Sequence, residues 1–177
     1  MDTEEITGYR IRAITPEVLD QLRVRDDAGH PSRIVQEEGG NPLRCCLAAS
    51  RPGERIALVS YAPLRRWAAQ TGARPGPYDE VGPVFIHPEP CGRPLDFPEI
   101  RRGARRVLRA YDADGGILGG RMIEWPCRKE AEALLAESLA DPEVAVVHVR
   151  AVEYGCFQFE LRRAHPADLH QRAAALA

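Results

Sequence analysis

Hydrophobic positions follow two spacings along the chain, a period of two that is typical of strands and a period of about 3.6 that is typical of helices. Alternating or β-branched runs predict strands at residues 43–48, 55–61, 83–86, 105–111, 117–123, 144–150 and 156–163. Helical spacing in CRKEAEALLAESLA predicts a helix whose apolar face carries Ala131, Leu134, Leu135 and Leu139. A second helix begins at Thr15-Pro16, where a hydroxyl N-cap precedes a proline at the first helical position.

Turn residues between the predicted strands indicate hairpins. Residues 112–116, DADGG, separate two of the strands, and residues 151–155 separate the last two. PADLHQRAAALA, residues 166–177, predicts a short C-terminal helix. We therefore expect an α+β fold, with a largely antiparallel sheet built from hairpins and helices packed on one side. A chain of 177 residues fits a single domain, residues 1–177, because single domains commonly have about 100 to 200 residues.

Two proline-rich segments flank the predicted strand 83–86. Residues 62–82 contain three prolines around a helical turn at Trp67, and residues 87–98 contain four. Long irregular loops inside compact domains are more often functional than simple connections need to be. We expect a pocket between these two loops and the sheet, with His87 delivered to its mouth by the end of the strand.

Charge and composition exclude several classes of function. The chain has 24 basic and 26 acidic residues, a net charge of −2, so it lacks the positive surplus that drives binding to a phosphate backbone, and no nucleic-acid partner is expected. The opening MDTEEITGYR is acidic where a signal peptide is basic, and no apolar run reaches the ~18 residues that span a bilayer. We expect a cytoplasmic protein with no membrane partner. Lys129 is the only lysine, a bias toward arginine that suggests a GC-rich bacterial source.

The register of the last hairpin decides which polar residues share a face. A five-residue loop at 151–155 sets Arg150 opposite Cys156 and His148 opposite Gln158. A four-residue loop would instead mix charged groups into the aromatic face, at a cost of about 2 to 7 kcal/mol per unpaired buried polar group. We expect the five-residue loop, with these four residues on one polar face and an apolar face made by Val147, Val149, Phe157, Phe159 and Leu161. The polar face either lines a site or faces solvent.

Four sequence blocks together resemble the bacterial domain-of-unknown-function family 1203. They are RCCLAASRPGE (44–54), GPVFIHPEPC (82–91), LRAYDADGGI (108–117) and DPEVAVVHVRAVEYGCFQFELR (141–162). The resemblance covers about residues 9–163 and implies one intact domain without naming a reaction. The matching polar positions are Cys46, His87, Cys91, Arg109, Tyr111, His148, Arg150 and Cys156. Family members often have a cysteine shortly before the arginine of the first block, where this chain has Leu43.

Five cysteines, an odd number without a C-x-x-C pair, fit reduced thiols better than a disulfide framework. A reactive thiol needs a nearby cation or base. Cys91 with His87, or Cys156 with His148, meets that need, and we take these four as candidate catalytic residues. The alternative is that both cysteines are structural.

Arginine and hydroxyl donors on the predicted sheet indicate an anion site. Arg109 and Arg150 can bind a carboxylate or phosphate with both arms of the guanidinium, assisted by Tyr111 and Gln158. These four are the candidate substrate-binding residues. An equally good alternative is an ordinary salt bridge from the arginines to Asp112 or Glu160.

Zinc is a further alternative. His87-x-x-x-Cys91 is a close pair of ligand types that Cys156, His148 or Cys46 would complete. Two prolines fall inside the pair and no second close pair exists, so we favour a rigid turn with a buried thiol and assign no metal ligands. No P-loop or dinucleotide fingerprint is present, and no nucleotide cofactor is expected.

The leading hypothesis is a small-molecule-binding protein or enzyme that acts on a polar or anionic metabolite in a pocket lined by arginine, histidine, tyrosine and cysteine. The alternative is a non-catalytic structural, interaction or zinc-holding domain.

Overall fold

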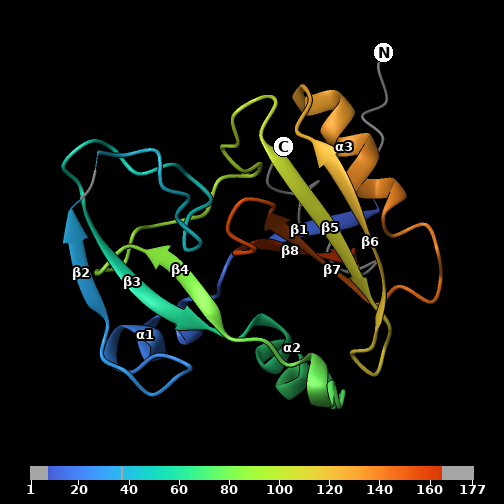
Figure 1. Ribbon diagram of the computed structural model, residues 1–177, viewed down its shortest axis with the longest axis horizontal. Coiled ribbons are helices and arrows are strands. Elements are labelled where there is room, and N and C mark those ends of the chain that lie inside the picture. Colours follow the sequence, from blue (N-terminus) through green and yellow to red (C-terminus); the bar gives the residue numbers. More distant parts are fainter. Residues whose placement is uncertain (1–7, 37, 165–177) are drawn as a thin grey trace, which may run out of the picture.

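The computed structural model describes residues 8–36 and 38–164. Within them eight strands and three α-helices confirm the α+β class, and every pairing between the strands is antiparallel. The strands are divided between two sheets, one of five strands and one of three (Figure 1). The C-terminal helix expected at 166–177 lies outside the described residues. No helix within the described part of the chain has the length and apolar content needed to cross a bilayer.

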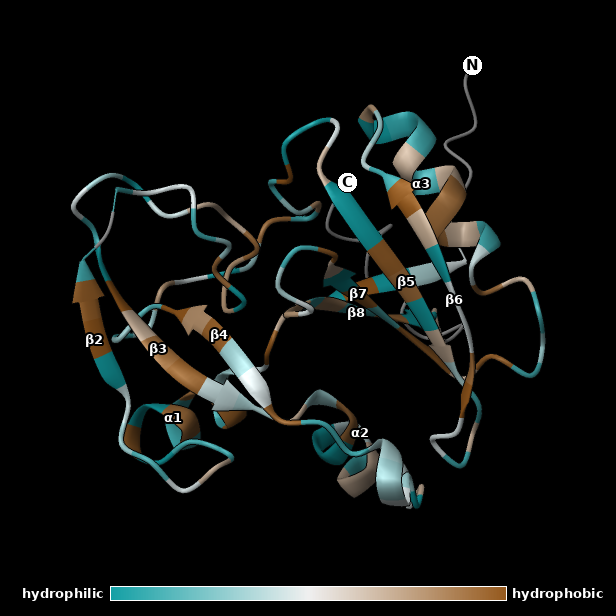
Figure 2. Cartoon of the chain, in the orientation of Figure 1, coloured by the Kyte–Doolittle hydropathy of each residue, from teal (hydrophilic) through white to brown (hydrophobic). Residues whose placement is uncertain are grey.

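The five-stranded sheet has the strand order β1-β8-β7-β5-β6. Its strands are β1 (Tyr9–Arg12), β5 (Arg105–Tyr111), β6 (Ile117–Glu124), β7 (Val146–Ala151) and β8 (Phe157–Arg163). Helix α3 (Arg128–Glu137) buries Ala131 and Leu135 against this sheet, as the helical spacing predicted. Along β5 hydropathy changes in bands, with two arginines at the start, then Val107 and Leu108, then Arg109 (Figure 2).

The three-stranded sheet has the order β2-β3-β4. Its strands are β2 (Arg33–Gln36), β3 (Arg55–Tyr61) and β4 (Gly82–Ile86), and a 3-10 turn, η1 (Gly76–Tyr78), precedes β4. Helix α1 (Pro16–Val24) packs Leu19 and Leu22 into the core of this sheet. Helix α2 (Pro63–Thr71) buries Trp67 with Tyr111 and Val146 of the larger sheet, and it lies between the two sheets in Figure 1.

The strand expected at 43–48 is wrong. Residues 44–46 form a turn, closed by hydrogen bonds from Leu47 N to Leu43 O at 2.8 Å and from Leu43 N to Ala48 O at 2.9 Å. Leu47 has a φ of 64°, in the left-handed region that non-glycine residues seldom adopt. Residues 43–47 are all buried, including Arg44, and a short run that is buried throughout shows no alternation that would distinguish a strand from a turn.

The register expected for the last hairpin is also wrong. His148 lies opposite Glu160 and Arg150 opposite Phe157, with a register shift between Val149 and Arg150. The shift moves Phe157 off the apolar face and stacks its ring edge-on against His148, with ring centroids 5.3 Å apart. A bulge adds one residue to one strand, and loop length alone therefore could not predict the facing pairs.

Candidate metal centre

Four ligand-type side chains meet at one edge of the smaller sheet. Cys45, Cys46, His87 and Cys91 each offer a nitrogen or sulfur atom, and these atoms all lie within 4.8 Å of one another. They come from the 44–46 turn, from the residue that follows β4, and from the proline-rich loop beyond it. Both cysteines of the turn are buried, whereas His87 and Cys91 are partly exposed.

The turn is attached to β4 by its backbone. Arg44 N donates to Phe85 O at 2.9 Å, and His87 N donates to Cys45 Sγ at 3.2 Å. Together with the left-handed residue Leu47, these bonds direct two consecutive cysteine side chains toward the histidine ring.

The loop that carries Cys91 is held from α1. Arg23 donates through Nε to His87 O at 3.2 Å and through Nη2 to Glu89 O at 3.1 Å. Prolines 88 and 90 fix φ and reduce the number of conformations open to the unfolded loop. The loop therefore holds Cys91 near the other three side chains.

The histidine ring is oriented by a carboxylate. His87 Nε2 lies 2.9 Å from Glu54 Oε1, while Nδ1 lies 3.4 Å from Cys45 Sγ and 3.8 Å from Cys46 Sγ. Hydrogen bonds from the Arg51 backbone and from His87 lower the pKa of Glu54, so this carboxylate is ionised and accepts a hydrogen bond from Nε2–H. Nδ1 then presents its lone pair to the sulfur atoms. Histidines that bind metals usually have their second nitrogen held in this way.

The sulfur atoms interact strongly with one another. A hydrogen bond from Cys45 lowers the pKa of Cys46 to about 6, and the same bond, together with burial, raises the pKa of Cys45. Burial also raises the pKa of Cys91. One thiolate, on Cys46, is therefore favoured before any ion is bound.

A buried cation lies beside the cluster. Arg44 is almost fully buried, and burial lowers its pKa to about 10 against the attraction of Cys156 and Cys45. Its guanidinium donates to Phe157 O at 2.7 Å and to Pro42 O, both of them backbone oxygens. Phe157 is in β8, so this side chain connects the cysteine turn to the larger sheet.

Of the candidate catalytic residues, only His87 and Cys91 lie in the cluster, where they join Cys46. His148 is fully buried, and its ring stacks between those of Tyr111 and Phe157. Cys156 Sγ contacts Tyr154 O at 3.5 Å. The pairing of Cys156 with His148 across the hairpin rested on the register that the structure corrects.

The candidate anion-binding arginines converge on a carboxylate of the chain itself. Arg109 Nη1 lies 3.1 and 3.0 Å from the two Glu80 oxygens, and Arg150 Nη2 lies 3.1 Å from Oε2. The salt-bridge alternative thus describes both arginines, with Glu80 in place of the partners that were expected. Tyr111 beside them is buried, and Gln158 instead lines a small cavity next to Arg44.

Sequence reasoning did not select Cys45 or Glu54. The adjacent cysteines were visible as a doublet, RCC, and Glu54 as the end of the turn RPGE, both in the first block of the resemblance. Neither signal gives the distance to a histidine more than thirty residues away.

The model of one protein family matches residues 40–163, and its description is "Protein of unknown function (DUF1203)". The chain therefore belongs to this family. All four cluster residues and Glu54 lie inside the part that matches the DUF1203 model. Searches of the curated proteins and of the solved structures found no significant match.

Proposed function

We propose that this DUF1203 chain is a metal-holding domain that binds one zinc ion through Cys45, Cys46, His87 and Cys91. The observation that carries the proposal is the convergence of four nitrogen and sulfur ligand atoms within 4.8 Å. Three thiolates and one imidazole form a ligand set typical of structural zinc sites.

The spacings fit a tetrahedral ion. With Zn–S near ~2.3 Å and Zn–N near ~2.0 Å, ligand atoms in a tetrahedron lie about 3.5 Å apart for S···N and about 3.8 Å for S···S. The two measured sulfur distances to His87 Nδ1, 3.4 and 3.8 Å, match the first value. The widest spacing of 4.8 Å requires one ligand to close by about 1 Å, and partly exposed Cys91, on a loop, is the ligand best placed to do so.

Charge supports the same assignment. A zinc ion with three thiolates and one neutral imidazole has a net charge of −1, which favours a nearby cation. Arg44 is such a cation, and no carboxylate of the described residues lies within ion-pair distance of it. Arg23, on the loop side, also favours a thiolate at Cys91.

Four protein ligands leave no open position for a substrate, which indicates a structural role. The ion would join the cysteine turn, the end of β4 and the proline-rich loop.

A nucleophile formed by Cys46, His87 and Glu54 is the competing chemistry. Because Cys46 is only 7% exposed, substrate access to its sulfur is poor.

Zinc content tests the proposal directly. We expect about one equivalent of zinc in protein purified without chelator from zinc-supplemented medium. Cys91→Ser should reduce this to below about a tenth of an equivalent, because one of four ligands is lost. Cys127→Ser is the matched control, since Cys127 is an exposed free cysteine outside the cluster, and it should bind zinc as wild type does.

Folded wild-type protein with less than about a tenth of an equivalent of zinc, cobalt or iron would refute the metal proposal. In that case iodoacetamide labelling distinguishes the remaining roles. Rapid labelling of Cys46 near its pKa of about 6 would support the nucleophile, and slow labelling would indicate a purely structural thiol.

A further inference from the structure

Strand β6 forms one edge of the five-stranded sheet, and no strand of the described residues pairs with its free side. The strand has eight residues, ILGGRMIE, of which only Ile123 is buried. Trp125 N, just beyond the strand, donates to Ala104 O at 2.8 Å. Alternation along the strand then directs the backbone N–H and C=O groups of Gly120 and Met122 away from β5. A long open edge of this kind is a template on which another strand can pair.

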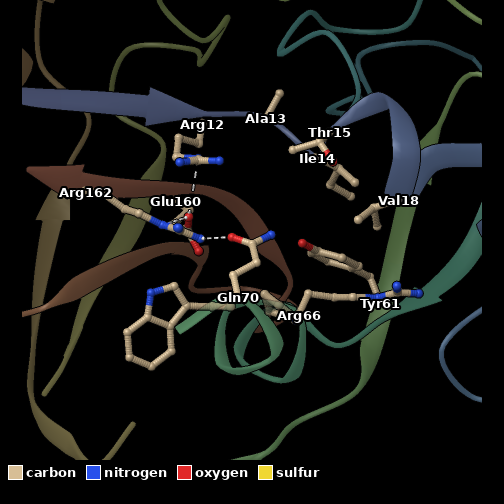
Figure 3. Close-up of a pocket in the computed structure, with 12 residues that line it drawn as sticks. Arg12, Ala13, Ile14, Thr15, Val18, Tyr61, Arg66, Gln70, Glu160 and Arg162 are labelled. Atoms are coloured by element: carbon tan, nitrogen blue, oxygen red, sulfur yellow. Dashed lines mark hydrogen bonds and ion pairs between the residues drawn. The ribbon is translucent and has the colours of Figure 1, made fainter. Parts of the chain in front are cut away.

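The opposite edge of the same sheet is better protected. Strand β1 has only four residues, and side chains at this end of the sheet are tied to one another and to α2 (Figure 3). Arg12 Nε lies 3.8 Å from Glu160 Oε1, and Arg162 Nη2 donates to Gln70 Oε1 at 3.0 Å. Short strands and charged side chains are common protections of a sheet edge. Strand β6 is twice as long and has no proline, and its register shift lies at its first residues, away from Gly120.

Exposed apolar side chains gather on β6. Ile117, Leu118 and Met122 are 39%, 45% and 63% exposed. Single exposed apolar side chains are common on protein surfaces and need no explanation. Three of them on the eight residues of an unpaired edge form a patch, and such patches indicate a surface that contacts another molecule.

Two glycines in the middle of β6 are not required by the fold of a single chain. Neither Gly119 nor Gly120 has a positive φ, and a Cβ atom placed on Gly119 meets no other atom within 4 Å. On Gly120 the nearest atom to such a Cβ is Val107 Cγ1, at the ordinary contact distance of 3.4 Å. Glycine weakens the interior of a strand and often marks a place where another backbone approaches closely. A partner strand along this edge accounts for both glycines.

We propose that β6 is the contact surface for a second copy of this chain. The two β6 strands pair antiparallel about a two-fold axis through Gly120, so that the two five-stranded sheets become one continuous sheet. This surface is independent of the zinc proposal, because none of the four cluster residues lies in β6.

The sequence of β6 favours a copy of itself in this register. Hydrogen-bonded pairs need outward-directed backbone groups from both strands, so the axis has to pass through Gly120, Arg121 or Met122. An axis at Arg121 sets two like charges directly opposite each other, which is unfavourable. An axis at Met122 sets exposed Leu118 beyond the end of the partner strand. With the axis at Gly120, Leu118 faces Met122 of the second copy. Gly119 then lies opposite Arg121 of the second copy and leaves room for its side chain.

Sedimentation velocity of the protein as purified measures its association. We expect a dimer at about 100 µM chain that dissociates on dilution, with a reducing agent present so that exposed Cys127 cannot link two chains. Met122→Lys places a charge in the apolar contact and should raise the dissociation constant of the dimer at least about tenfold. Val24→Lys is the matched control, because Val24 is a 78% exposed apolar residue of α1, and it should leave the dissociation constant unchanged.

A pair of charge variants tests the register. Gly119→Arg sets like charges opposite each other at two symmetric places and should weaken association at least about tenfold, whereas Gly119→Glu sets a carboxylate opposite Arg121 of the second copy and should strengthen it. Both side chains have room in a single chain, since nothing lies within 4 Å of the added Cβ. The proposal is overturned if wild type is a monomer at this concentration, if folded Met122→Lys protein associates as wild type does, or if the two Gly119 variants have equal dissociation constants.

Discussion

His148→Leu tests how the buried histidine contributes to stability. The side chain is fully buried in β7, and neither ring nitrogen has a hydrogen-bond partner among the described residues. Its nearest ionic neighbour, Glu160 Oε2, lies 3.6 Å from Nε2, beyond a good hydrogen bond. Burial lowers the pKa of His148 despite the attraction of Glu160, which indicates a neutral ring in the folded protein.

The lowered pKa of His148 indicates a neutral ring, whereas the lowered pKa of Glu160 would in part be explained by a charged one. Burial would raise the pKa of Glu160, but His148 and Arg162 outweigh it and the pKa is lowered, an effect that partly assumes a charged imidazole. We take the ring as neutral because desolvation of a fully buried imidazole is the largest effect acting on it. The ion pair from Arg162 Nε to Glu160 Oε1, at 2.5 Å, is sufficient to keep the Glu160 carboxylate ionised.

The expected magnitudes follow from this neutral state. At pH 7, leucine removes two unpartnered nitrogens, worth about 1 to 3 kcal/mol, and loses ring contacts with Tyr111 and Phe157 worth about 0.5 to 1.5 kcal/mol each. The free energy of unfolding should therefore change by no more than about 1 to 2 kcal/mol, in either direction. Lower pH should separate the two proteins more clearly.

The sign of the pH effect is fixed by the lowered pKa. The unfolded histidine titrates near ~6.5 and takes up a proton that the folded protein resists, so wild type loses stability as pH falls below that value. If the folded ring stays neutral, this loss is about 2 kcal/mol at pH 5. His148→Leu lacks the histidine contribution, so it should gain about that amount relative to wild type between pH 7 and pH 5.

Urea unfolding at pH 7, 6 and 5, followed by tryptophan fluorescence, measures the difference. His30→Leu is the control, because the His30 side chain is 73% exposed and this variant should track wild type. A His148→Leu protein that is destabilised by more than about 3 kcal/mol at pH 7, with no relative gain at pH 5, would show that the histidine is charged and paired with Glu160.

Two further substitutions test the fold and the arginine pair. Leu135→Ala should lower the free energy of unfolding by about 2 to 5 kcal/mol because Leu135 lies on the buried face of α3. Leu134 is only partly buried, so Leu134→Ala should cost clearly less, and equal costs measured by urea unfolding would contradict the assigned helix face. Glu80→Gln should cost less than about 1 kcal/mol, since the Glu80 side chain that Arg109 and Arg150 share is 46% exposed and solvent screens these pairs. In 1 M salt the loss should shrink, and a larger or salt-independent loss would refute this.

The parts of the fold that local patterns encode were predictable. Strands β5 and β6 are joined by a turn rich in aspartate and glycine, and α3 carries its apolar residues at helical spacing. Strands β1 and β2 were missed because each has four residues of which only two are apolar, YRIR and RIVQ. They are strands because of their partners, β1 pairing with β8 at the far end of the chain.

The proposed metal site depends on a turn that the sequence did not predict. Consecutive side chains of a strand point to opposite faces, so a strand at 43–48 would have kept Cys45 and Cys46 from sharing one ion. The turn removes that exclusion, because its left-handed residue Leu47 reverses the chain and both sulfur atoms come within 3.8 Å of His87 Nδ1. Nothing local in RCCLAAS selects the turn over the strand. What fixes it is the backbone bond from Arg44 to β4 and the burial of the Arg44 guanidinium against β8, contacts that form only when both sheets are in place.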